Sequence, residues 1–179
     1  MTAKTTWVID PSHSEIAFKV KHLMISNVKG QFSEFSGQLV TDGDDFTTSD
    51  ISFQMNPASI STGAADRDAH LKSPDFFDVE NYKEINFTSG KLSKSGSDEF
   101  SLTGDLTIKG VSQPVKLDVE FGGLMKDPWG NVKAGFTLEG KINRKDFALT
   151  WNAALEAGGV LVGDEIHLNL DVQLLQQKA

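Results

Sequence analysis

Residues 166–174 read Ile166-His167-Leu168-Asn169-Leu170-Asp171-Val172-Gln173-Leu174, an unbroken alternation of apolar and polar side chains. A period of two is typical of a β-strand that has one buried and one solvated face. The run therefore predicts a strand whose even-numbered side chains enter an apolar interior.

The same alternation recurs along most of the chain. It predicts eight strands, at residues 15–22, 28–40, 51–55, 85–87, 100–108, 115–121, 136–142 and 166–174. In the second of them the parity shifts between Phe32 and Phe35, which indicates a bulge near Ser33-Glu34 or a bend at Gly37. Short turn sequences rich in Gly, Asp and Asn separate most of the strands, so successive strands are expected to pair antiparallel.

One segment departs from the strand pattern. Residues 64–72 read Ala-Ala-Asp-Arg-Asp-Ala-His-Leu-Lys, which are helix-tolerant residues, and Pro74 follows them. The segment predicts one short helix between the third and fourth strands.

These elements predict an all-β fold in a single domain that covers residues 1–179. Eight strands with one apolar face each fit an eight-stranded antiparallel up-and-down barrel. A two-sheet sandwich also fits the periodicity. The barrel is favoured because the outward side chains are too polar to pack under a second layer, and the helix is too weakly amphipathic to cover a sheet.

The inward faces of such a barrel form an apolar lumen. Twelve Phe against one Tyr agree with a large dry region. An eight-stranded barrel has room for packed side chains or for one small ligand, so a ligand-binding barrel and a filled barrel with a structural role both remain open. The side chains expected to line the lumen are Ile16, Phe18, Val20, Phe53, Met55, Phe87, Leu102, Leu106, Leu117, Val119, Phe136, Leu138, Leu168 and Leu170.

Composition excludes several classes of function. The net charge of −8 repels phosphate backbones and anionic membrane surfaces, so nucleic acid is not an expected partner. The chain has no cysteine, and hence no disulfide or thiolate chemistry. No apolar stretch is long enough for a leader or a membrane span, so no stable membrane insertion is expected. The chain as given is expected to be cytoplasmic, or periplasmic if a leader has been removed from it.

Catalytic signatures are scarce, and neither a catalytic residue nor a cofactor is expected. The sequence has no Gly-x-Ser-x-Gly elbow, no Walker motif and no Gly-x-Gly-x-x-Gly loop. The alternative is a metal-dependent or other enzyme that uses Asp10, His13, His22 and His70 at the barrel mouth, because imidazole and carboxylate groups suit transition metals. The favoured interpretation is that residues 10–14 form a turn locked by Asp10 and that His22 lies at the barrel rim.

Two further polar sites have two interpretations each. Arg67 and His70 lie three residues apart on the helix and hence on one side of it. They hold the polar head of a ligand, or they tie the helix to a neighbouring loop. Trp151 and Asn152 form either a lid at the rim or a plug that closes the open end of the barrel.

A series of motifs runs in order along the whole chain. They are Trp7-x-Ile9-Asp10-Pro11-x-His13-Ser14, Phe18-x-Val20-x-His22, Gly30-x-Phe32, Arg67-Asp68-x-His70-Leu71-Lys72-Ser73-x-x-Phe76-Phe77-Asp78, Gly104-x-Leu106-Thr107-Ile108-Lys109-Gly110, Arg144-x-Asp146-Phe147 and Val162-Gly163-Asp164. Together they resemble the YceI-like family of polyisoprenoid-binding proteins.

The resemblance implies a lipocalin-like barrel whose lumen binds and sequesters or transports a long-chain isoprenoid or similar lipid, with a quinone or its precursor among the candidates. The family is bacterial, many members act in the periplasm, and it is not known for enzymes. Dimers are common in the family, so a homodimer is one of the assemblies that the resemblance allows. The head group of the ligand is expected near His22, Arg67, His70, Trp151 and Asn152.

Overall fold

Antiparallel strands dominate the computed structural model, which describes residues 3–153 and 161–177. None of the described helices has the length and apolar character needed to cross a bilayer. The helices are η1 (Pro11–His13), η2 (Pro57–Ser59), α1 (Ala65–Lys72) and η3 (Arg144–Phe147). The strands are β1 (Lys4–Ile9), β2 (Glu15–His22), β3 (Ser26–Phe32), β4 (Phe35–Asp42), β5 (Asp45–Met55), β6 (Ile60–Ser61), β7 (Ile85–Lys94), β8 (Glu99–Ile108), β9 (Val111–Lys126), β10 (Val132–Asn143) and β11 (Val162–Gln176).

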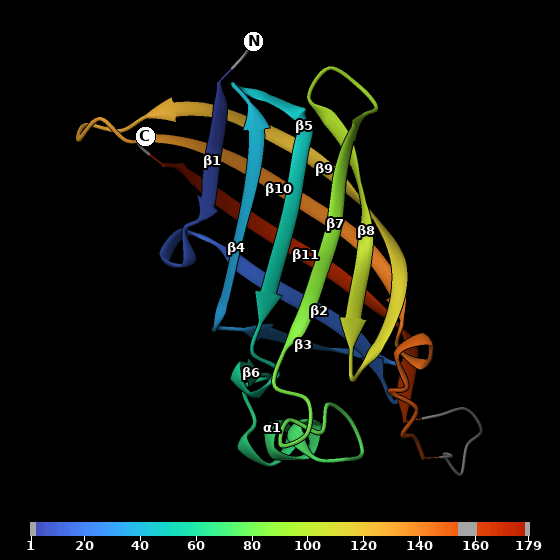
Figure 1. Cartoon of the computed structure of the whole chain (residues 1–179). Helices are drawn as coiled ribbons and strands as arrows, with labels where there is room; N and C mark the ends of the chain where they lie inside the picture. The colour runs from blue at the N-terminus through green and yellow to red at the C-terminus, as the bar shows by residue number, and fades with distance from the viewer. Residues whose placement is uncertain (1–2, 154–160, 178–179) are drawn as a thin grey trace.

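Eight of these strands close into a ring. Their order is β1-β4-β5-β7-β8-β9-β10-β11, and β11 pairs back onto β1 with Trp7 opposite Gln176 and Ile9 opposite Leu174. Every neighbouring pair in the ring is antiparallel. The predicted closed eight-stranded antiparallel barrel is therefore confirmed, and Figure 1 shows the two sets of strands crossing as its front and back walls.

The membership of the ring differs from the prediction. β2 lies outside the ring and pairs with residues 162–171 of β11, and β3 and then β6 extend the sheet beyond it. β1 takes a place in the ring although its apolar residues Trp7, Val8 and Ile9 are consecutive and show no alternation. The predicted strand at 28–40 is two strands, because the chain breaks at Ser33-Glu34 where the parity shifts.

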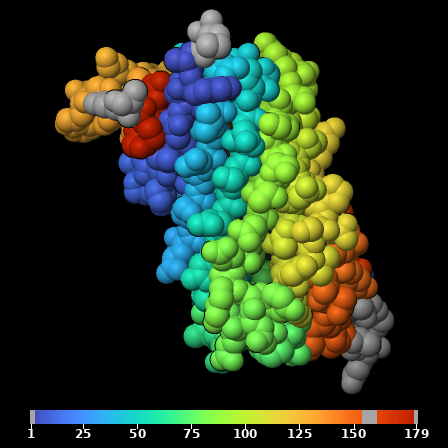
Figure 2. Space-filling model, viewed as in Figure 1, coloured from blue at the N-terminus to red at the C-terminus, as the bar shows by residue number. Residues whose placement is uncertain are grey.

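The structure also corrects the predicted position of the helix among the strands. α1 follows β5 and the two-residue β6, so it does not lie between the third and fourth strands of the structure. Its place in the sequence, between residues 55 and 85, is as expected. Figures 1 and 2 show α1 and the chain after it packed over the lower end of the barrel.

Aromatic side chains fill the upper part of the barrel. The ring of Phe46 lies 5.1 Å from that of Trp7, 5.7 Å from that of Phe121 and 5.1 Å from that of Phe136, measured between centroids. Trp7 has no exposed surface and donates its indole N–H to Thr41 Oγ1 over 3.0 Å. We call Trp7, Phe46, Phe121 and Phe136 the aromatic plug, because their packing leaves the open volume of the barrel at the end that carries α1.

Candidate ligand-binding cavity

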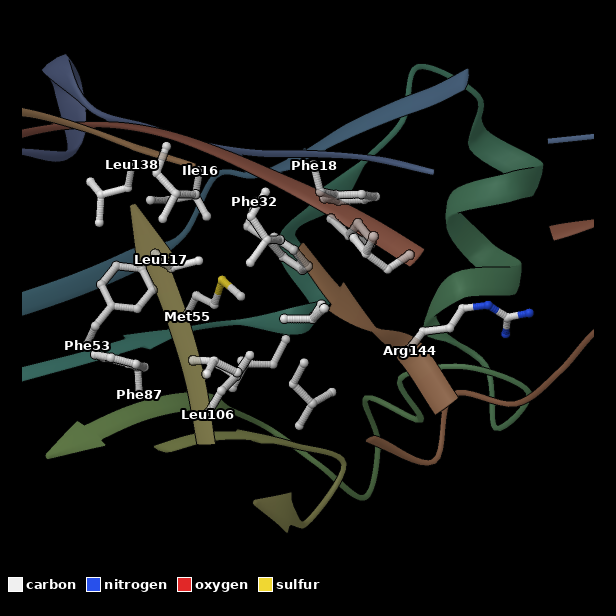
Figure 3. Close-up of a pocket in the computed structure, with 18 of the residues that line it drawn as sticks. Ile16, Phe18, Phe32, Phe53, Met55, Phe87, Leu106, Leu117, Leu138 and Arg144 are labelled. Carbon is white, nitrogen blue, oxygen red and sulfur yellow. The ribbon is translucent and has the colours of Figure 1, made fainter. Parts of the chain in front are cut away.

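A cavity of about 520 Å³ lies inside the barrel. All the strands from β1 to β11 contribute to its walls, and the residues around α1 and η3 contribute one end (Figure 3). Its size falls within the range of about 300–1,000 Å³ that is usual for small-molecule sites. Its walls are almost entirely aliphatic and aromatic, which suits a ligand with a long apolar part.

The structure places all fourteen predicted lumen side chains on the wall of this cavity. They come from strands on different sides of the barrel, and Figure 3 shows Ile16, Phe53 and Leu106 converging on one space. The alternation of strand side chains explains this agreement, because residues of one parity share one face. Contact of these side chains with a ligand stays a prediction.

Several wall residues keep accessible surface although they lie inside the barrel. Phe18, Leu106, Leu168 and Leu170 are only half-buried, whereas Leu117 and Leu138 on the same wall are buried. A core side chain normally packs against neighbours on all sides. The accessible surface of the half-buried group therefore faces open space, and the barrel is not filled by its own side chains.

The cavity also has wall residues that the alternation did not identify. Phe32 belongs to the strand with shifted parity, and Phe76 and Phe77 lie in the loop after α1. The ring of Phe32 meets that of Phe77 edge-on at 5.9 Å and that of Phe18 at 5.7 Å. Only the motif containing Phe76-Phe77 pointed to the loop, since a loop has no periodicity to analyse.

His70 and Trp151 meet at the end of the cavity that carries α1. Their rings are 4.6 Å apart and nearly perpendicular, and Phe76 lies 5.1 Å from His70 and 5.5 Å from Trp151. The other side of the imidazole is held by Asp75, whose Oδ2 is 2.9 Å from His70 Nε2. The three rings form a wall that is aromatic toward the cavity and polar at its rim.

Arg67 borders the cavity but uses its guanidinium locally. Its Nε and Nη2 donate to the Oγ1 and the carbonyl oxygen of Thr62, each over 2.7 Å. Asp68 accepts from the backbone N–H and the hydroxyl of the same threonine, over 2.8 and 2.6 Å. Of the two interpretations of this segment, the structure shows the tie between helix and loop.

His22 ends strand β2 at the rim of the cavity, opposite Val162 of β11 and Ser26 of β3. Asn152 does not line the cavity, contrary to the prediction. Its amide side chain donates to the carbonyl of Val162 over 2.7 Å and accepts from the Val162 N–H over 3.0 Å. Both the nitrogen and the oxygen of the side-chain amide therefore hold the 151–153 segment against β11.

Arg144 is the main residue at this end of the cavity that the sequence did not predict as part of the site. Its side chain is only 2% exposed, and it donates to the carbonyls of Gly163, Leu149, Trp151 and Val162 over 2.6–3.3 Å. Burial lowers its pKa from the usual value, while the carboxylate of Asp164, 3.7 Å away, acts in the opposite sense. Figure 3 shows Arg144 at one end of the cavity, on the side of α1.

The alternative site built on four polar residues is not assembled. Asp10 and His13 contact each other on η1, with 2.9 Å between Oδ2 and Nδ1, and neither lines the cavity that His22 and His70 border. Asp10 also accepts from the Ser12 N–H, as expected of a turn lock. Across residues 3–153 and 161–177, no three His, Cys, Asp or Glu side chains are grouped so as to hold a metal ion.

The fold and the cavity define a class of protein, the closed antiparallel β-barrels that enclose an apolar space. Within that class, residues 7–174 match the YceI-like domain, and the chain belongs to this family.

Known proteins support this assignment. A UPF0312 protein of Staphylococcus aureus is 39% identical over 163 residues, which cover 90% of this chain and 92% of the relative. The crystal structure of a Campylobacter jejuni YceI protein is 37% identical, with a TM-score of 0.74 over 88% of this chain and 90% of that one. A polyisoprenoid binding domain from Saccharophagus degradans shares the fold at 12% identity, with a TM-score of 0.63 over 97% of this chain and 98% of that one.

Proposed function

We propose that this protein binds a long-chain isoprenoid or a similar lipid in the barrel cavity and sequesters or transports it. The observation that carries the proposal is an open apolar cavity of about 520 Å³ inside a closed barrel. A lipid has the shape and the polarity that such walls favour. A structural neighbour named as a polyisoprenoid binding domain supports the same class of ligand, and a quinone or its precursor fits it.

The energetics of such binding need no covalent chemistry. Each methylene group that leaves water for an apolar wall contributes about 0.8 kcal/mol, so a long chain supplies affinity by contact alone. The polar head then needs only positioning at the end that carries α1, where His22, Arg67, His70 and Trp151 border the cavity. We therefore propose a binding protein and not an enzyme.

The test is whether purified protein carries a lipid in the cavity. Native mass spectrometry and solvent extraction should recover a co-purifying prenyl or other long-chain lipid. Leu168→Trp places a bulky ring in the cavity and should abolish recovery. Asn169→Trp is the matched control, because Asn169 is the exposed neighbour on the same strand and lies outside the wall.

Two results would overturn the proposal. One is a thermal-shift assay in which prenyl alcohols or quinones stabilise neither the wild type nor either variant, even after delipidation. The other is that Leu168→Trp and Asn169→Trp retain equal amounts of lipid, since the lipid would then sit outside the barrel.

A further inference from the structure

The hairpin formed by β2 and β3 has a charge unlike that of the rest of the molecule. Between Glu15 and Glu34 the chain contains no acidic residue, but it contains Lys19, Lys21 and Lys29. Residues 16–33, which make up all of the hairpin except Glu15, thus carry +3, and the remaining residues carry −11 to give the net −8 of the whole chain. A basic element on an acidic protein is a candidate contact for an anionic surface.

Two of these lysines face each other. Lys19 of β2 lies directly opposite Lys29 of β3 in the register of the hairpin. Like charges in opposite positions of an antiparallel pair destabilise the pair. The arrangement therefore costs stability in the isolated protein, and an anionic partner would relieve that cost.

The tip of the hairpin is apolar and exposed. Leu23, Met24 and Ile25 have exposed fractions of 40%, 59% and 83%. Leu23 and Met24 occupy the two central positions of a turn closed by the Ile25 N–H and the His22 carbonyl, with φ of 54° and 62°. Such a turn favours Asn and Gly, so local backbone preference does not explain its apolar residues.

The tip adjoins the rim of the lipid cavity. Lys21 and His22, which immediately precede the tip, and Val28, on the returning strand, all border the cavity. The backbone N–H of Leu23 donates to the carbonyl of Leu161 over 2.9 Å, and Leu161 is itself a wall residue. A surface that receives the tip would therefore lie next to the end of the cavity that carries α1.

We propose that the β2–β3 hairpin is a docking element for anionic lipid bilayers. Leu23, Met24 and Ile25 insert among the acyl chains, and Lys19, Lys21 and Lys29 contact the headgroups. Apolar side chains combined with a few cations are the features by which peripheral elements bind membrane interfaces. Docking there would bring the cavity rim to the source of an apolar ligand.

The negative charge of the whole chain does not oppose this contact at short range. Charges more than a Debye length away, about 8 Å at physiological salt, are largely screened. Two acidic residues of β11 near the tip end of the hairpin, Asp164 and Glu165, are ion-paired, and the third, Asp171, lies opposite Glu15 at the far end of β2. Asp164 lies 3.7 Å from Arg144 and 3.4 Å from Lys145, and Glu165 lies 3.5 Å from Lys141.

Vesicle flotation tests the proposal with the full chain and two vesicle types, phosphatidylcholine alone and phosphatidylcholine with phosphatidylglycerol. We expect binding to the anionic vesicles and at least about tenfold less to the neutral ones. The tip variant Leu23→Asn/Met24→Gly/Ile25→Ser provides the residues that the turn prefers, so it keeps the fold and should reduce binding at least about tenfold.

Two other variants separate the contributions. Met125→Ser/Trp129→Ser removes exposed apolar side chains (73% and 80%) from the β9–β10 hairpin, at the upper end of the barrel in Figure 1, and should leave binding unchanged. Lys19→Gln/Lys29→Gln should weaken binding at about 0.1 M salt and have little effect at about 1 M, where the Debye length is only about 3 Å.

Equal binding to both vesicle types overturns the proposal, as does an equal loss from the tip variant and the β9–β10 variant. Self-association that disappears in the tip variant, measured by sedimentation without vesicles, would assign the tip to a second copy of the chain and overturn it too. Leu168→Trp, whose cavity is obstructed, should still bind the vesicles. That result separates docking from lipid binding in the cavity.

Discussion

At the scale of single residues, Arg144 is the side chain whose loss should damage the fold most specifically. Four carbonyl oxygens from the 149–151 and 162–163 segments converge on its guanidinium. Arg144→Met keeps most of the volume but removes these donors. The carbonyl of Val162 keeps its hydrogen bond from Asn152, and each of the other acceptors left unpaired costs about 1–3 kcal/mol where water cannot reach it. We expect a clear fall in the free energy of unfolding, measured by urea titration.

Two comparisons sharpen this expectation. Arg144→Lys keeps the charge but has too few donors for four carbonyls, so its stability should lie between those of the wild type and Arg144→Met. Lys145→Met removes a cation from the next position, where the side chain is 52% exposed, and should change stability little. Equal effects of Arg144→Met and Lys145→Met would contradict the pinning role of Arg144.

Asp10 makes a residue-scale prediction about pH. Burial alone would raise its pKa, but hydrogen bonds from Ser12 and His13 outweigh burial and hold the pKa below the usual 3.8. A carboxylate with a lowered folded-state pKa stabilises the fold above the unfolded value, and this contribution disappears as the pH falls through the folded value. Asp10→Asn should therefore be less stable than wild type near neutral pH.

The same pair of proteins should converge in acid. As the pH falls below 3.8 and then through the lower folded-state pKa of Asp10, the wild-type carboxyl becomes protonated and resembles the amide of the variant, so the difference in unfolding free energy between them should shrink. Urea titrations of both proteins across this range provide the measurement. A difference that grows toward low pH would show that the hydrogen bonds of Asp10 do not favour its ionised form.

At the scale of elements, the position of α1 depends on Asp68. Its carboxylate accepts two hydrogen bonds from Thr62, which precedes the helix. Asp68→Ala should loosen this junction and speed amide exchange across residues 62–72, measured by hydrogen exchange and mass spectrometry. Asp66→Ala removes the same charge from an exposed position on the same helix and should leave exchange there close to that of wild type.

The sequence could predict the strands that alternate, and with them most of the cavity wall. In an alternating strand, the odd or even position of a residue shows which face its side chain occupies. Side chains such as Phe18, Phe53 and Leu168 could therefore be placed on the cavity wall without knowing which strands pair. β1 was missed because Trp7, Val8 and Ile9 are consecutive, and a buried run has no period. Which strands form the ring could not be deduced either, since pairing of β1 with both β4 and β11 joins segments far apart in the chain.

The polar end of the site was predicted less well for a related reason. Arg144 and Asn152 act through backbone carbonyls brought near by the fold, and a single polar residue in a loop has no periodic signature. Sequence proximity suggested that Trp151 and Asn152 act together. In the structure Trp151 borders the cavity while Asn152 holds the chain behind it.

At the scale of the whole molecule, the barrel is a tube obstructed near one end. The aromatic plug packs the upper part, and the apolar cavity extends toward α1 and the β2–β3 hairpin. The proposed ligand would enter at the lower end with its chain pointing toward the plug. The plug would then set the length of chain that the walls can cover.

This geometry predicts how affinity depends on ligand length. In a series of linear long-chain alcohols, each added methylene should tighten binding about fourfold, equivalent to ~0.8 kcal/mol, until the chain reaches the plug. Longer chains should show no further gain. Phe46→Ala removes the central ring of the plug and should shift the plateau to longer chains, although it should also destabilise the fold by about 3–5 kcal/mol.

Phe147→Ala is the control for that loss of stability. Phe147 is 1% exposed, belongs to η3 at the other end of the barrel and lies outside the cavity wall. This variant should lose comparable stability but keep the wild-type plateau, as measured by thermal shift or isothermal calorimetry. A plateau that stays at the same chain length in Phe46→Ala would mean that the plug does not limit the ligand, and that the chain leaves the barrel elsewhere.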